Sequence, residues 1–183
     1  MTPILFVHGG GDNAHHYDLE IVQRLREALG TERSIEYPRV AGLERIEWAP
    51  TSAELSERFA TLARAATVVA HSVGGAAALK VLSGSDRFPI RNLFLLAPPY
   101  KAEDSHWGSD DFTFSNEFAR CLDPNLNVAI YHSRDDDTIP VDDAILYKQK
   151  LPTAQVHLLD GYGHQFCRTL DFLADDIRSA ICV

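Results

Sequence analysis

The sequence has few cysteines, and their spacing matches no metal or disulfide pattern. Cys121, Cys167 and Cys182 are an odd number, and none belongs to a C-x-x-C pair. Structural zinc sites and disulfide frameworks need paired cysteines, so we expect neither, and we predict no metal and no organic cofactor. Reduced thiols are typical of a cytoplasmic protein. Each cysteine is expected to be a small, buried hydrophobic residue.

Basic clusters and long apolar runs are also absent. The 17 Lys and Arg residues are outnumbered by 26 Asp and Glu, which gives a formal charge of −9 and a pI of about 5.3. An acidic surface repels phosphate backbones and anionic membranes, so we expect neither nucleic-acid nor membrane partners. The apolar opening at 4–7 is short and has no charged leader or cleavage site, which argues against a secretion signal. We therefore expect a cytoplasmic protein, monomeric by default, that acts on a small molecule.

The composition is that of an ordinary folded chain, with 45% hydrophobic and 23% charged residues. Its 183 residues suffice for one domain, 1–183, with a substantial core. Short apolar runs that end in glycine or proline alternate with segments of helical period. We expect strands at 3–7, 34–37, 67–71, 90–97, 127–132 and 155–159, and helices at 18–29, 51–65, 74–82, 141–150 and 167–180. This alternation predicts an α/β fold: a mostly parallel central sheet of about six strands with helices on both faces.

A serine directly follows the strand expected at 67–71, in the run Ala70-His71-Ser72-Val73-Gly74. A strand that turns sharply into a helix is where a nucleophile elbow lifts a serine hydroxyl off the sheet. Gly74 would let the strand and helix approach closely, and the Val73 N–H would face a developing oxyanion. Ala70 departs from the usual elbow, which has glycine there. The alternative is a Ser72 that only caps the helix. Strand alternation directs His71 the other way, so we do not predict it to be the base.

Three glycines follow the first strand, in the run His8-Gly9-Gly10-Gly11. Glycines let a backbone approach a substrate and offer its N–H groups, which is typical of an oxyanion loop. We predict Gly10 as the donor, with Gly9 as the second choice. A dinucleotide-binding loop would need a glycine at position 14, where this chain has Ala14, and no G-K-[ST] follows. A plain turn remains the other interpretation.

Candidate acid and base residues follow two later strands. Three carboxylates at 135–137 come after the strand at 127–132, and one of them can orient a histidine. His164 lies in the glycine-flanked run 161–164, after the strand at 155–159. The order serine, aspartate, histidine along the chain is that of the α/β-hydrolases, and all three follow predicted strand ends. A metal site at His15-His16 has no supporting partner pattern.

Four motifs, F-V-H-G-G-G, A-H-S-V-G-G, S-R-D-D-D-T-I-P-V and D-G-Y-G-H-Q, span essentially the whole chain. Together they resemble the small, cap-poor α/β-hydrolases that include the retinoblastoma-binding-protein type of serine hydrolase. The resemblance implies an α/β-hydrolase fold with a minimal cap. In that family the acid lies four residues before the proline of a D-x-x-[VI]-P pattern, which selects Asp136. It also implies hydrolysis of esters or related acyl substrates.

The sequence therefore predicts a serine hydrolase that works through an acyl-enzyme, with Ser72 as nucleophile, His164 as base and Asp136 as orienting acid. The long segment 100–118 could form a small lid in which Trp107, Phe112 and Phe114 line an acyl pocket; ordinary packing is the alternative. Two functional alternatives stay open. One is a catalytically silent binding protein on a hydrolase scaffold, and the other is a thioesterase, amidase or C–C hydrolase that uses the same triad.

Overall fold

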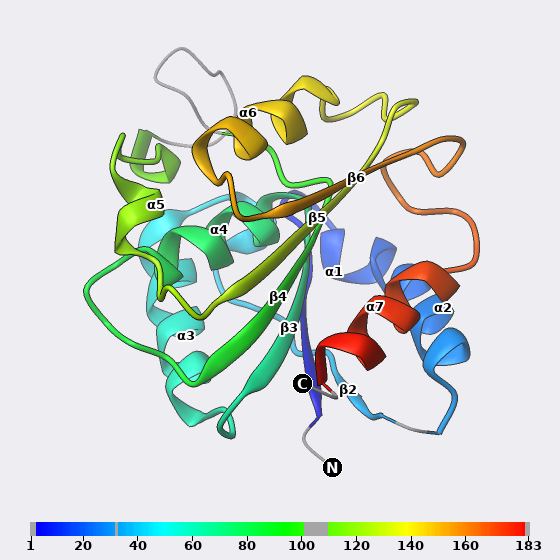
Figure 1. Cartoon of the computed structure of the whole chain (residues 1–183), viewed down its shortest axis with the longest axis horizontal. Helices are drawn as coiled ribbons and strands as arrows, with labels where there is room; N and C mark the ends of the chain where they lie inside the picture. The colour runs from blue at the N-terminus through cyan, green and yellow to red at the C-terminus, as the bar shows by residue number, and fades with distance from the viewer. Residues whose placement is uncertain (1–2, 32, 101–109, 182–183) are drawn as a thin grey trace.

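The computed structural model describes residues 3–31, 33–100 and 110–181, and within them the chain forms a parallel sheet of six strands (Figure 1). The strand order is β2-β1-β3-β4-β5-β6, and each neighbouring pair is parallel. The strands are β1 (Ile4–Val7), β2 (Ile35–Glu36), β3 (Ala66–His71), β4 (Ile90–Leu96), β5 (Asn127–Ser133) and β6 (Gln155–Leu159). All six strands expected from the sequence are present, so the predicted α/β sheet is confirmed.

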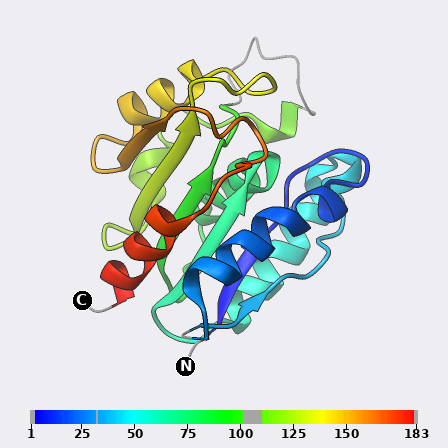
Figure 2. The ribbon, with the colours of Figure 1, turned by 90° about the vertical axis from the view of Figure 1, so that its right-hand side faces the viewer.

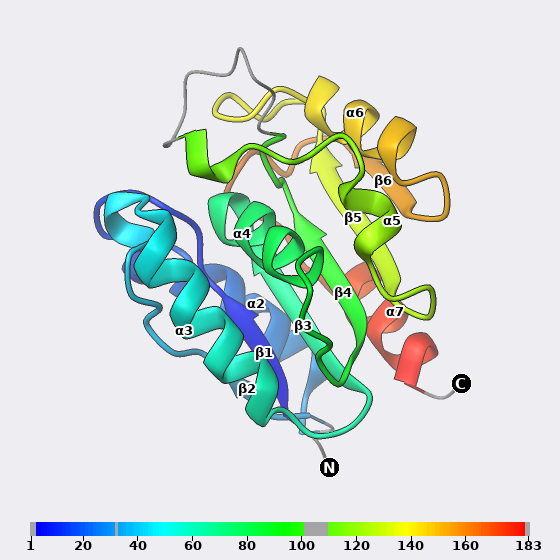
Figure 3. The same cartoon turned by 90° about the vertical axis from the view of Figure 1, so that its left-hand side faces the viewer.

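Helices cover both faces of this sheet. The helices are α1 (Ala14–Tyr17), α2 (Leu19–Leu29), α3 (Trp48–Thr61), α4 (Ser72–Leu82), α5 (Phe118–Cys121), α6 (Asp142–Lys150) and α7 (Asp171–Ile181), with 3₁₀ turns η1 (Leu43–Arg45) and η2 (Asp110–Phe112). Figure 3 shows α3, α4, α5 and α6 on one face, and Figure 2 shows α2 and α7 on the other. Two separate apolar clusters fill these two layers.

The centre of the sheet is the most completely buried part of the molecule. Every residue of β3 is buried, and so is every residue of β4 except Arg91. Helix α4 is buried at every position except Lys80, and its alanines and glycines let it lie close against the sheet. These continuous apolar runs are typical of parallel strands that are covered on both sides.

Several helices differ from the sequence expectation. Helices α1 and α5 were not predicted, because four residues carry too little periodicity. Helix α3 begins at Trp48, and the hydroxyl of Thr51 does not cap it but donates to the carbonyl oxygens of Glu47 and Ala41, at 2.7 and 3.1 Å. Pro50 lies in the first turn, where no N–H is needed. Helix α7 begins at Asp171 instead of position 167.

The expectation that the cysteines are buried was wrong for the two that the structure describes. Cys121 and Cys167 are free but exposed, at the end of α5 and in the loop before α7. Cys182 lies outside the described residues. Across the described ranges, none of the helices is long and apolar enough to span a bilayer.

The strand order places a switch point between β1 and β3. Strand β1 is followed in sequence by β2 on one side, whereas β3 and the later strands extend on the other side. The connections after β1 and β3 therefore leave toward opposite faces, and ligands of open α/β sheets bind in the crevice this creates at the carboxyl ends. The glycine loop and Ser72 follow these two strands.

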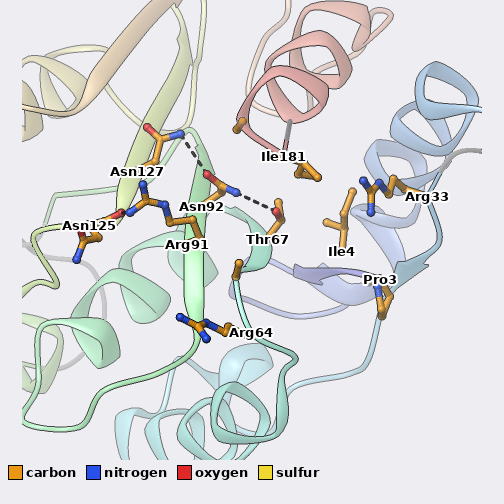
Figure 4. A pocket seen from close by; sticks show the side chains of 12 residues that line it. Pro3, Ile4, Arg33, Arg64, Thr67, Arg91, Asn92, Asn125, Asn127 and Ile181 are labelled. Atoms are coloured by element: carbon orange, nitrogen blue, oxygen red, sulfur yellow. Dashed lines mark hydrogen bonds between the residues drawn. The ribbon is translucent and has the colours of Figure 1, made fainter. Parts of the chain in front are cut away.

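A pocket of about 810 Å³ lies at the opposite end of the sheet, where the strands begin (Figure 4). Arg33, Arg64 and Arg91 surround it, and Arg91 donates to the carbonyl oxygen of Asn125. Asn92 in its wall is buried and donates to Thr67 at 3.3 Å. None of the predicted site residues lines this pocket.

Candidate active site

Ser72 stands at a sharp turn between β3 and α4. It is the first residue of the helix, and its φ of 49° is in the left-handed region that few non-glycine residues adopt. A β-carbon on Gly74 would lie 2.0 Å from the carbonyl oxygen of His8, so only glycine lets α4 pass so close to the glycine loop. Ala70 is fully buried in β3, and Ser72 adopts the strained turn with alanine at this position.

His164 comes to Ser72 from the loop between β6 and α7. Its Nε2 lies 3.2 Å from Ser72 Oγ, and its Nδ1 lies 2.8 Å from Asp136 Oδ2. Because Nδ1 donates to the carboxylate, Nε2 of the neutral ring can accept the hydroxyl proton. Gly163, immediately before it, has a φ of 59°, a conformation that glycine adopts without steric cost.

Asp136 is held as an anion by several donors. Its Oδ1 accepts the N–H groups of Thr138 and Ile139, at 2.9 and 2.8 Å, and its Oδ2 accepts His164 Nδ1. Its side chain has no exposed surface. Burial alone would raise the pKa of Asp136, but the hydrogen bonds from His132, His164 and Ile139 hold that pKa well below its usual range. The structure therefore brings Ser72, His164 and Asp136 together in one hydrogen-bonded series.

The two neighbours of Asp136 have other surroundings. Asp135 accepts the hydroxyl of Ser133 and the N–H of Gly161, which lies 2.9 Å away, so it anchors the loop that carries His164. The hydrogen bond from Ser133, with that from Gly161, lowers the pKa of Asp135. Asp137 is exposed and accepts the Thr138 hydroxyl at 3.1 Å.

His132 adjoins the Asp136 carboxylate and was not among the predicted site residues. Its side chain is fully buried, and its Nε2 lies 2.9 Å from the carbonyl oxygen of Ile139 and 3.4 Å from Asp136 Oδ2. An N–H at this nitrogen supports the same carboxylate oxygen, Oδ2, that accepts His164 Nδ1. The position of His132 at the end of β5, three residues before the carboxylates, was the available signal.

The glycine loop lies directly beside the start of α4. A β-carbon on Gly10 would lie 2.9 Å from Val73 Cβ, so the two predicted oxyanion donors are neighbours. Within the described part of the chain the Gly10 N–H makes no hydrogen bond, and the Val73 N–H lies in the first turn of a helix, where N–H groups lack helical partners. Gly9 is different, because its N–H donates to Asp18 Oδ2 at 2.7 Å. This bond conflicts with Gly9 as a donor to substrate.

The aromatic residues expected to line a pocket are packed instead. Phe112 is 1% and Phe114 7% exposed, and both belong to the apolar cluster under α3 and α4. Phe112 contacts Trp48 edge-on, with ring centroids 5.3 Å apart. Trp107 lies outside the described residues, as does the rest of 101–109 in the predicted lid at 100–118.

Two further buried polar residues adjoin the series. His71 Nδ1 lies 2.8 Å from Asp18 Oδ2, and His164, not His71, contacts Ser72 Oγ. His71 Nε2 lies 3.0 Å from the carbonyl oxygen of His164. Asp18 was not among the predicted residues, and no motif marks it, because it is 53 residues from His71 in the sequence.

No cluster of three or more metal-ligating side chains is found among the residues that the structure describes. His15 of the pair His15-His16 stacks on Tyr37 instead, with ring centroids 4.4 Å apart.

Comparison with known proteins gives one family match. The model of the "Alpha/beta hydrolase family" matches residues 4–123, which include the glycine loop and Ser72. No curated protein matches the sequence.

Solved structures share the fold at low sequence identity. The ydeN gene product from B. subtilis is 19% identical, with a TM-score of 0.81 and 100% of both chains covered. A serine hydrolase from the polyaromatic-hydrocarbon-degrading bacterium Cycloclasticus zankles is 16% identical, with a TM-score of 0.71 over 99% of this chain and 89% of that one. A serine hydrolase involved in carbazole degradation, the CarC enzyme, is 12% identical, with a TM-score of 0.70 over 100% of this chain and 91% of that one.

Proposed function

We propose, because the chain belongs to the alpha/beta hydrolase family, that it is a serine hydrolase that cleaves an ester or related acyl bond of a small substrate through an acyl-enzyme. One observation carries the proposal: Asp136 Oδ2, His164 Nδ1, His164 Nε2 and Ser72 Oγ form one series, with contacts of 2.8 and 3.2 Å. A serine hydroxyl is a weak nucleophile until such a base accepts its proton.

The reaction would proceed in two halves. His164 Nε2 takes the proton of Ser72 as Oγ attacks the substrate carbonyl, and the resulting imidazolium gives that proton to the leaving group. The acyl group is then bonded to Ser72 Oγ. Water repeats the attack with His164 again as base, which releases the acid and restores the serine. Asp136 stays ionised, holds the ring in the required tautomer and stabilises the imidazolium.

The oxyanion of each tetrahedral intermediate would be held by the N–H groups of Gly10 and Val73. Gly10 offers an N–H without a partner among the described residues, and Val73 offers one at the positive end of α4. Two such donors, fixed before the reaction, stabilise charge that develops only in the transition state.

Within the family, the closeness to the retinoblastoma-binding-protein type rests on the four sequence motifs and stays a prediction. The setting is also a proposal. The few unpaired cysteines suggest the cytoplasm, and the lack of long apolar runs suggests a monomer. The charge of −9 argues against nucleic-acid and membrane partners. The same residues would serve a thioesterase, an amidase or a C–C hydrolase, and a substrate panel separates these.

Hydrolysis of a short-chain p-nitrophenyl ester tests the proposal. We expect turnover by the wild type and about a 10⁴-fold or greater loss of kcat in Ser72→Ala, because removal of the nucleophile stops acyl transfer. Ser179→Ala is the matched control, since Ser179 is exposed on α7 and bonds only to its own helix. Full activity in Ser72→Ala would contradict the proposal, and an inactive but folded wild type would favour a silent binding protein.

A further inference from the structure

Two buried side chains next to Ser72 have no part in the acyl transfer described above. His71 precedes the serine at the end of β3, and Asp18 lies at the junction of α1 and α2. Their side chains are 1% and 2% exposed. Ionisable groups are rarely buried this completely unless each is paired, and these two are paired with each other.

One hydrogen bond joins the members of this pair, and two more connect the pair to the two loops of the site. Asp18 Oδ2 accepts the Gly9 N–H at 2.7 Å, which fixes the glycine loop. It also accepts His71 Nδ1–H at 2.8 Å. His71 Nε2 lies 3.0 Å from the main-chain oxygen of His164, which fixes the loop of the base. The path from one loop to the other therefore runs entirely through two buried side chains.

The partners also define the charge of His71. One ring nitrogen faces a carboxylate and the other faces a carbonyl oxygen, and neither oxygen can donate. Both nitrogens must therefore carry hydrogens, which only the imidazolium ion has. A neutral ring would direct a lone pair at one of the two oxygens.

The surrounding groups agree with this charge. The His164 ring, with its centroid 4.8 Å from that of His71, is neutral while its Nε2 accepts the Ser72 proton. Burial alone would lower the pKa of His71, but the charge and hydrogen bond of Asp18, the His164 carbonyl and the charge of Asp136 raise it. Burial would raise the pKa of Asp18, but His71 and the Gly9 N–H lower it. His8 also faces Asp18; burial lowers its pKa, and its Nε2 accepts the Val40 N–H at 3.0 Å, so its ring is neutral.

We propose that Asp18 and His71 are a positioning pair that couples the glycine loop to the loop of the base, so that Gly10 and His164 keep their places around Ser72. The inference rests on the proposed function. A buried ion pair adds little net stability compared with apolar residues of the same volume, so stability alone does not explain it. Its bonds end instead on the two loops whose relative position sets the site geometry.

Asp18→Asn tests the pair with an almost isosteric change. The amide oxygen can still accept Gly9 N–H and one imidazole N–H, but it no longer stabilises a second proton on His71. The bond to the His164 carbonyl is then lost. We expect kcat to fall about 10- to 100-fold with KM changed less than about twofold, because positioning is lost and not substrate binding.

The pH profile separates positioning from loss of stability. In the wild type, kcat should fall on the alkaline side as His71 loses its proton, at a pH above the ordinary histidine pKa of about 6.5. In Asp18→Asn this fall should move to lower pH. Asp176→Asn is the matched control. Asp176 lies in α7, away from Ser72, and accepts the Tyr131 hydroxyl at 2.6 Å. This variant should keep the wild-type kcat and pH profile.

A second measurement reads the charge of His71 in the wild-type protein itself and does not depend on whether Asp18→Asn folds. In wild-type protein with ¹⁵N-labelled histidine, His71→Gln identifies the His71 signals, and both ring nitrogens should be protonated at neutral pH. An unprotonated ring nitrogen on His71 would overturn the proposal, as would Asp18→Asn with wild-type kcat and pH profile. A folded wild type that neither hydrolyses esters nor reacts with a fluorophosphonate would instead overturn the proposed function, and the proposal that rests on it.

Discussion

At the scale of single residues, the Ser72 site depends on how closely backbones approach. A β-carbon on Gly74 would lie 2.0 Å from the His8 carbonyl oxygen, and one on Gly10 would lie 2.9 Å from Val73 Cβ. Two glycines thus let the glycine loop lie directly on the first turn of α4. This contact brings together the two N–H groups that we propose bind the oxyanion.

Gly74→Ala should therefore destabilise the protein, although alanine favours helices. The new methyl group would force the glycine loop from α4, and we expect a cost of about 3 kcal/mol, at the upper end for overpacking. Urea unfolding measures it. Gly75→Ala is the control, because its β-carbon would meet no atom closer than 3.3 Å. Equal stability of the two variants would show that the close approach is not needed.

Some of the site residues could be predicted from the sequence and others could not. Ser72 and His164 each follow a strand and have glycine neighbours, so local patterns mark them. Asp136 has two identical neighbours, and only the family resemblance separated it from them. Asp18 could not be found, because its partner His71 is 53 residues away and an aspartate before a helix is typical of a simple cap.

At the scale of elements, the strong periodic segments were predicted and the weak ones were not. Apolar runs fix the strands, since a buried parallel strand needs apolar residues on both faces. Helix α1 has four residues and gave no pattern. The start of α3 was misplaced because Thr51 and Glu54 imitate a capping box, whereas Glu54 accepts the Ala41 N–H at 2.7 Å.

The turn between α3 and β3 offers a test at this scale. Ala65 is exposed and has a φ of 61°, a left-handed conformation that costs an alanine about 1–2 kcal/mol. Ala65→Gly should raise the free energy of unfolding by about 0.5–1 kcal/mol after the entropy cost of glycine. Ala63→Gly, exposed without a positive φ, should not. A lower free energy of unfolding in Ala65→Gly than in the wild type would show that the backbone at Ala65 is not strained.

At the scale of the whole molecule, the acidic chain places ionised carboxylates inside its active-site end. Asp18 and Asp136 have almost no side-chain exposure, and partners lower the pKa of each below its usual value. The pocket surrounded by arginines lies at the other end of the sheet. The two ends therefore differ in chemistry, and the proposed reaction belongs to the end where the strands finish.

The buried carboxylates set the response to acid. The unfolded chain takes up protons near the ordinary pKa of about 3.9, and the folded chain does so at lower pH. The stability that these carboxylates contribute is therefore complete above the unfolded pKa. It is lost as the pH falls toward their pKa in the folded chain. Urea unfolding at a series of pH values should give a free energy that declines below about pH 4, and less steeply in Asp136→Asn. An equally steep decline in the wild type and in Asp136→Asn would show that the lowered pKa of Asp136 does not cause the acid sensitivity.

The central claim is that Ser72 is an activated nucleophile, and the site of covalent labelling tests it most directly. The folded wild-type protein would be treated with a fluorophosphonate, digested and mapped by mass spectrometry. We expect one adduct, on the peptide that contains Ser72, and none in Ser72→Ala. An adduct on another residue, or an unlabelled wild type, would contradict it.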